Sequence, residues 1–130
     1  MGAASYAIYG AGCAMIITLD WPDASLSPNR KNGKHWTATS KAKDHYKLCA
    51  HSMTIQACYT YAPPTVPFRL VITFVPPDNR RRDLDNLLAS IKPGIDGIAQ
   101  ALEIDDYVFE QITIKRGGKQ KPGWVTIEFV

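Results

Sequence analysis

The chain is predicted to fold as a single α+β domain, with a mixed sheet of roughly four strands and two helices packed on one face. Three observations predict this class. A length of 130 residues suffices for one hydrophobic core. The composition, 45% hydrophobic and 21% charged, is that of a globular protein. Runs of β-branched residues alternate with two long stretches of helical spacing, which favours helices layered on a sheet.

Four segments have the pattern of β-strands: residues 15–19, 68–75, 111–115 and 124–129. The second, FRLVITFV, has the strongest pattern, because it combines a long apolar run with β-branched side chains. The last two segments are joined by RGGKQKPG, whose glycine and proline residues predict a β-hairpin. Residues 20–34 are rich in Pro, Ser, Asn and Gly and are expected to form a loop.

Two helices are expected between these strands. Thr39 or Ser40 is suited to cap the first helix, which is predicted to run to about residue 59. Apolar side chains recur at helical spacing over residues 84–102 and predict the second helix. Pro93 and Gly94 lie inside that stretch, so a kink or a break is expected there.

The N-terminal segment and the cysteines indicate where the protein resides. Residues 1–14 are expected to be a loose extension of a domain that spans residues 15–130, because they lack the basic start of a signal peptide. No apolar run reaches the length of a membrane span, so no membrane partner is expected. The three cysteines are odd in number and lack metal-ligand spacing, which favours a reducing cytoplasm.

The charges of the chain are segregated, although the net charge is only +3. Basic residues gather at 30–34, 41–47, 80–82 and 115–121, and acidic residues gather at 83–85, 96 and 103–110. A basic surface around an acidic spot is suited to a polyanion held against a metal ion.

A pair of carboxylates follows an arginine triplet after the strongest strand. If the backbone is extended there, Asp83 and Asp85 point to the same side and can share one cation. Mg²⁺ takes oxygen ligands and keeps several waters, so two or three carboxylates suffice. Asp105 and Asp106 follow the second helix and join this site only if the chain folds back.

A purely structural interpretation of the same residues is available. Asp83 is suited to cap the second helix, and Asp85 would stabilise its first turn through the helix dipole. The later Asp pair would then be a polar turn, and the arginine triplet a solvated loop. The guanidinium groups favour the functional interpretation, because they bind phosphate directly beside the carboxylates.

The stretch RRRDLDNLL, followed by a helix and a paired-Asp turn, resembles the RusA-type Holliday-junction resolvases, small endodeoxyribonucleases often found in phages and prophages. The strand MIITLDWP and the Ser-Pro-Asn loop after it agree, and the resemblance runs from residue 15 to the C-terminus. It implies a homodimer that resolves four-way DNA junctions by Mg²⁺-dependent phosphodiester hydrolysis, with Mn²⁺ as the alternative ion.

The resemblance also implies which acidic residues act. Its catalytic aspartates match Asp83, Asp85 and one residue of the later pair. The family pattern favours Asp106 as that third metal ligand, with Asp105 as the alternative.

The family's essential lysine lies four residues after the second Asp of DLD, where this chain has Ala89. Lys92 is the expected replacement. On one continuous helix it would lie within about 20° of Asp85. Its four-residue interval to Asp96 also matches the interval that follows the family lysine.

DNA phosphates are expected to be held mainly by basic side chains. The predicted DNA-binding residues are Arg80, Arg81, Arg82, Lys115, Arg116, Lys119, Lys121, Asn29 and Arg30. Two other functions remain open. One is a catalytically weak or inactive DNA-binding protein of the same fold. The other is a Mg²⁺-dependent enzyme that acts on small phosphate esters, which would be expected to carry a glycine-rich phosphate loop opening a helix.

Overall fold

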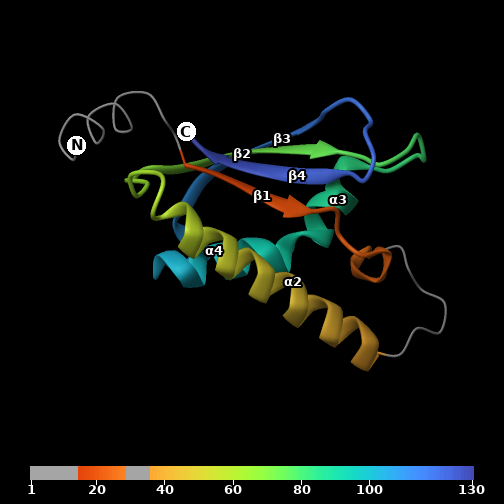
Figure 1. Ribbon diagram of the computed structural model, residues 1–130, viewed down its shortest axis with the longest axis horizontal. Helices are drawn as coiled ribbons and strands as arrows, with labels where there is room; N and C mark the ends of the chain where they lie inside the picture. The colour runs from red at the N-terminus through yellow and green to blue at the C-terminus, as the bar shows by residue number, and fades with distance from the viewer. Residues whose placement is uncertain (1–14, 29–35) are drawn as a thin grey trace.

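The computed structural model describes residues 15–28 and 36–130 of an α+β protein, in which a four-stranded mixed sheet is covered by three helices (Figure 1). The predicted extension over residues 1–14 and the predicted DNA-binding residues Asn29 and Arg30 lie outside the described residues. The elements are β1 (Ile16–Asp20), the short 3₁₀ helix η1 (Ala24–Leu26), α2 (Trp36–Ala57), β2 (Phe68–Val75), α3 (Leu84–Ser90), α4 (Lys92–Leu102), the 3₁₀ helix η2 (Asp106–Val108), β3 (Phe109–Arg116) and β4 (Trp124–Phe129).

The strands lie in the order β1-β4-β2-β3. β4 pairs antiparallel with β1 and β2, and β3 pairs parallel with β2. The predicted hairpin between the last two strands is therefore wrong, because β2 lies between them. Residues 117–123 instead cross the end of β2, where the Gly117 and Gln120 N–H groups donate to the carbonyls of Phe74 and Pro76 at 2.7 and 2.8 Å. Glycine and proline mark a turn, but they do not determine which strands pair.

One face of the sheet forms the hydrophobic core. Alternate side chains of β1, β2 and β4 are buried, as expected for a sheet with one covered face. The helices lie on that side of the sheet (Figure 1). The fully covered side chains include those of Ile17, Leu70, Ile72, Phe74, Val125 and Ile127.

The single helix expected over residues 84–102 is divided into α3 and α4, so three helices are present rather than two. Ile91, at φ −98° and ψ 6°, lies between them, and Pro93 falls in the first turn of α4. The expected break is confirmed, and its cause is Pro93. The ring has no N–H to donate and would collide with the carbonyl four residues earlier. Because Lys92 and Asp85 lie on different helices, the phase relation expected between them is wrong.

Helices α2 and α4 pack so closely that one position in their contact must be glycine. A Cβ atom on Gly97 would collide with the backbone carbonyl of Lys47 and lie 3.2 Å from the amide nitrogen of His51. Two backbones have to separate before any larger side chain fits there.

We therefore expect Gly97→Ala to lower the free energy of unfolding by about 1–3 kcal/mol, the usual range for overpacking. Helix propensity alone predicts the opposite sign, because alanine favours a helix over glycine by about 1 kcal/mol. Urea unfolding of the variant measures the change. Gly118→Ala is the matched control, because a Cβ atom there meets nothing within 4 Å. Equal midpoints for both variants would contradict the close packing.

Candidate functional site

The turn between β2 and α3 is organised by Asp78. Its Oδ1 accepts a hydrogen bond from the Arg80 N–H at 3.0 Å and lies 2.9 Å from Nη2 of Arg82. The backbone hydrogen bond from Arg80 and the interaction with Arg82 hold the pKa of the Asp78 carboxyl below its usual value. The turn that carries the arginine triplet therefore has a defined shape.

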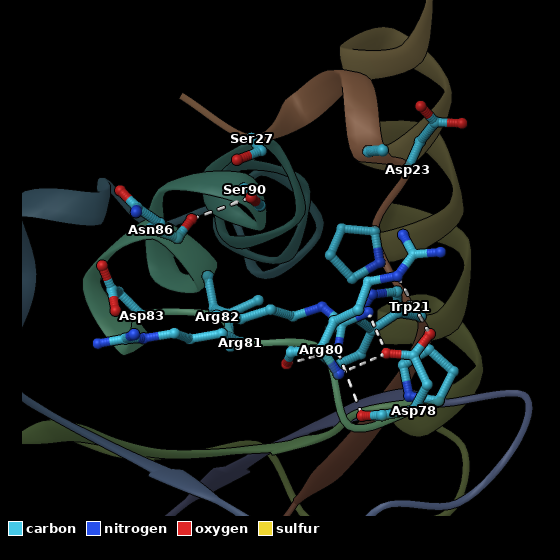
Figure 2. Close-up of a pocket in the computed structure, with 14 residues that line it drawn as sticks. Trp21, Asp23, Ser27, Asp78, Arg80, Arg81, Arg82, Asp83, Asn86 and Ser90 are labelled. Carbon is cyan, nitrogen blue, oxygen red and sulfur yellow. Dashed lines mark hydrogen bonds and ion pairs between the residues drawn. The ribbon is translucent and has the colours of Figure 1, made fainter. Parts of the chain in front are cut away.

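Arg82 is engaged inside the protein. Its side chain is only 19% exposed, and its guanidinium carbon lies 5.2 Å from the centroid of the Trp21 ring, a cation–π distance. In Figure 2 the side chain extends toward Trp21 and Asp78. The ion pair with Asp78 and the contact with Trp21 together occupy this guanidinium.

Four other cations remain accessible near the turn. The Arg80 side chain is 82% exposed, and Arg81 makes no hydrogen bond or ion pair in the described part of the chain. Arg81 extends away from Trp21, on the side where Asp83 lies (Figure 2). Arg116 donates through Nη2 to the Arg82 carbonyl at 2.6 Å. Arg116 and Lys119 line one hollow together with Arg80 and Arg81. We call Arg80, Arg81, Arg116 and Lys119 the basic rim. Lys115 and Lys121 are exposed but do not line this hollow.

Asp83 and Asp85 lie at the start of α3. Asp83 has the extended backbone of an N-cap residue, at φ −83° and ψ 141°, whereas Asp85 is already in the first helical turn. The condition of an extended backbone through both residues is therefore not met, and the structural interpretation describes their backbone positions correctly. The Asp83 carboxylate nevertheless makes no capping hydrogen bond. Both carboxylates are exposed and without a hydrogen-bonding partner among residues 15–28 and 36–130.

Lys92 lies between the carboxylates of Asp96 and Asp106, which form a second acidic cluster apart from Asp83 and Asp85. Its ammonium lies 2.5 Å from Oδ1 of Asp96 and 2.8 Å from Oδ2 of Asp106. The chain folds back after α4 because Glu103 adopts the left-handed conformation, at φ 58° and ψ 42°, which returns the paired-Asp turn toward Lys92. Asp105 lines a shallow hollow with Asp96 and Asp106.

The predicted catalytic residues thus fall into two groups. Asp83 and Asp85 precede or open α3, whereas Lys92, the first residue of α4, contacts Asp96 and Asp106. The described residues contain no group of three or more acidic, histidine or cysteine side chains placed to hold a metal ion. The donor chemistry of Asp83 and Asp85 fits a hard cation, because their oxygens are exposed and uncommitted. Asp106, in contrast, is committed to Lys92.

The chain is similar to an uncharacterized protein of Xylella fastidiosa strain Temecula1. The two are 40% identical over 111 residues, which cover 84% of this chain and 71% of the other. The chain belongs to the same family as the Xylella protein. No family model matches the chain. Within the described part of this family member, no helix is long and apolar enough to cross a membrane.

Two residues of this family member that shape the site were not identified from the sequence. Asp78 had a signal, because Pro-Pro-Asp-Asn is turn-forming and aspartate commonly accepts from the N–H two residues later. Trp21 had none, since its contact with Arg82 joins residues far apart in the chain.

The ion pair between Lys92 and Asp106 determines how both groups titrate. The hydrogen bond from Lys92 holds the pKa of Asp106 below its usual value. Partial burial lowers the pKa of Lys92, but the hydrogen bonds to Asp106 and Asp96 outweigh it and raise that pKa. The contribution of Asp106 to stability is present above its unfolded pKa and is lost as the pH falls through its folded pKa. The contribution of Lys92 is present below its unfolded pKa and is lost as the pH rises through its folded pKa.

Lys92→Ala is therefore expected to raise the pKa of the Asp106 carboxyl toward its ordinary value. Carboxyl ¹³C NMR titration of the protein and the variant measures the shift. Lys43→Ala, at an exposed position of α2, is expected to leave the pKa of Asp106 unchanged. The same Asp106 pKa with and without Lys92 would refute the role of this ion pair.

Proposed function

We propose that the protein is a structure-selective endodeoxyribonuclease that resolves four-way DNA junctions by Mg²⁺-dependent hydrolysis of phosphodiester bonds. One observation carries the proposal: the Asp83 carboxylate, free of the capping bond its position favours, lines the same pocket as Arg80 and Arg81. A metal-binding oxygen donor therefore lies beside phosphate-binding cations. The resemblance of RRRDLDNLL to the RusA-type resolvases supports the same function.

Asp83 and Asp85 would hold the ion, either Mg²⁺ or Mn²⁺, with water completing its coordination. When bound, the ion would polarise the scissile phosphate and lower the pKa of a bound water. Asp106 would join the ion only by giving up its ion pair with Lys92, and its neighbour Asp105 is the alternative ligand. A three-carboxylate site would therefore require both the loss of that ion pair and the approach of Asp106 to Asp83 and Asp85.

The cations of the chain have separate tasks in this proposal. The basic rim would hold phosphates that flank the cut, and such contacts give affinity without sequence information. Lys92 would supply a compact positive charge against the phosphate as charge develops on it, oriented by Asp96 and Asp106. Arg82 would instead maintain the shape of the turn through Asp78 and Trp21.

We further propose that the protein is a homodimer that acts on branched DNA in the cytoplasm. A two-fold dimer presents two equivalent sites, which suits paired nicks in a four-way junction. Sedimentation at micromolar concentration is expected to give about twice the chain mass of 14.4 kDa.

The decisive experiment incubates the pure protein with a labelled four-way junction and with a matched linear duplex, with and without Mg²⁺. Cleavage of the junction alone, and only with the ion, is expected. The lack of a three-ligand group among the described residues favours a second candidate, an inactive junction-binding protein of the same fold. Binding without nicks in either Mg²⁺ or Mn²⁺ would establish the second candidate and reject the first.

The basic rim makes a separate prediction about salt. Arg81→Ala is expected to reduce the slope of log affinity against log salt by about 0.7–0.9, the value for one phosphate contact. Arg69→Ala is the matched control, because Arg69 is an exposed arginine at the opposite end of β2. Fluorescence anisotropy at several salt concentrations measures both slopes. An unchanged slope in Arg81→Ala would place the phosphate contacts elsewhere.

A further inference from the structure

Beside the turn that carries Arg80, Arg81 and Arg82, which we call the arginine turn, lies a cavity of about 640 Å³. Its lining includes Trp21, which is labelled in Figure 2, and Pro22, both before η1. Pro77 of the turn and Leu87 of α3 also line it. The volume lies in the range of small-molecule sites, and these four side chains provide largely apolar walls.

Polar groups reach this cavity from two directions. The Asn86 side-chain amide, with one acceptor and two donor hydrogens, has no partner in the described part of the chain. The Ser90 hydroxyl donates to the Asn86 backbone carbonyl at 2.9 Å, so its oxygen can still accept a hydrogen bond. Arg80 and Arg81 supply positive charge at the same cavity. Apolar walls, a donor and acceptor edge and two cations match a nucleobase attached to a phosphate.

We propose that this cavity binds one unpaired nucleotide of a branched DNA. A base inside a duplex is stacked and paired, so it enters such a hollow only when it leaves the stack. Leaving the stack costs least for a base that is already unpaired. Because Asp83 lines the same cavity, the phosphate of the bound nucleotide lies beside the carboxylate that would hold the metal. The position of this nucleotide next to the cut rests on the proposed nuclease function, whereas its binding does not.

The test measures binding in metal-free buffer, where no cleavage occurs. Three labelled duplexes of one sequence are compared by fluorescence anisotropy: fully paired, with one extra unpaired nucleotide, and with one extra abasic unit. The duplex with the unpaired base is expected to bind about 10-fold more tightly than either of the others, the scale of one base–aromatic contact. Equal affinity for the unpaired base and the abasic unit would overturn the proposal, because both bend the duplex and only one offers a base.

Two variants locate the preference in the cavity. Asn86→Leu removes the hydrogen-bonding edge at similar size, and Ala24→Phe fills the cavity from an exposed position of η1. Each is expected to abolish the 10-fold preference and to leave affinity for the paired duplex unchanged. Arg69→Ala is expected to keep the preference.

The preference and the cleavage reaction can fail independently. If both cavity variants retain the preference, the nucleotide binds elsewhere and the proposal is wrong. If the protein prefers the unpaired base but never cleaves junctions, the nucleotide site is supported and the proposed nuclease function is rejected. If it cleaves junctions but does not prefer the unpaired base, only the proposed nucleotide site is rejected.

Discussion

Asp83→Asn and Asp85→Asn are each expected to slow Mg²⁺-dependent junction cleavage by at least about 10²-fold, the scale for losing one preorganised group that stabilises charge in the transition state. The change removes one negative charge and keeps the size of the side chain. Neither carboxylate makes a hydrogen bond or ion pair within the described residues, so the fold is expected to be unaffected. Junction affinity in metal-free buffer is expected to remain nearly intact, because it depends on lysine and arginine.

The control for these two variants is Asp44→Asn. Asp44 is an exposed aspartate on α2 and lines none of the hollows around the arginine turn. Its cleavage rate is expected to equal that of the unmodified protein. Cleavage at that same rate by either Asp83→Asn or Asp85→Asn would show that the metal is held elsewhere or that none is used.

The parts of the fold that the sequence predicts are those determined locally. The limits of β2 and β4 agree with the predicted strands at residues 68–75 and 124–129. Each segment carries its own strand signal, because its β-branched and apolar side chains are local to it. The pairing of β3 with β2 instead of β4 was not predicted. Pairing is decided by contacts between distant segments, and a loop rich in glycine and proline fits a crossover as well as a hairpin.

The candidate site shows the same division. The backbone position of Asp83 at the start of a helix was foreseen, but whether its carboxylate caps the helix or faces the pocket depends on side-chain contacts that a local pattern does not specify. Lys92, as the replacement for the family lysine, was expected to face Asp83, Asp85 and the paired-Asp turn, and among these it contacts only Asp106. The geometric reason was wrong, because the helix ends before Lys92. The contact arises from the fold-back at Glu103, a non-glycine residue in a conformation that the sequence does not signal.

The ion pairs of Lys92 are too exposed to contribute much to the stability of the fold. Its side chain is 54% exposed, and its two carboxylate partners, Asp96 and Asp106, are 39% and 40% exposed. Ion pairs with this exposure contribute little to folding, because solvent screens them. A loss of activity in Lys92→Ala would therefore not be explained by unfolding.

Lys92→Ala is expected to bind junctions normally and to cleave them at least about 10²-fold more slowly, with little change in melting temperature. Lys92→Arg is expected to restore little activity, because a planar guanidinium does not reproduce a compact ammonium between two carboxylates. Asp106→Asn is expected to lower the rate as well, since it removes one of the groups that orient Lys92.

Lys43→Ala on α2 serves as the control and is expected to cleave at the normal rate. Single-turnover cleavage of a labelled junction measures all four variants. A normal rate for Lys92→Ala would make the cluster with Asp96 and Asp106 a surface ion pair without a part in the reaction, and the charge that stabilises the transition state would have to come from the basic rim.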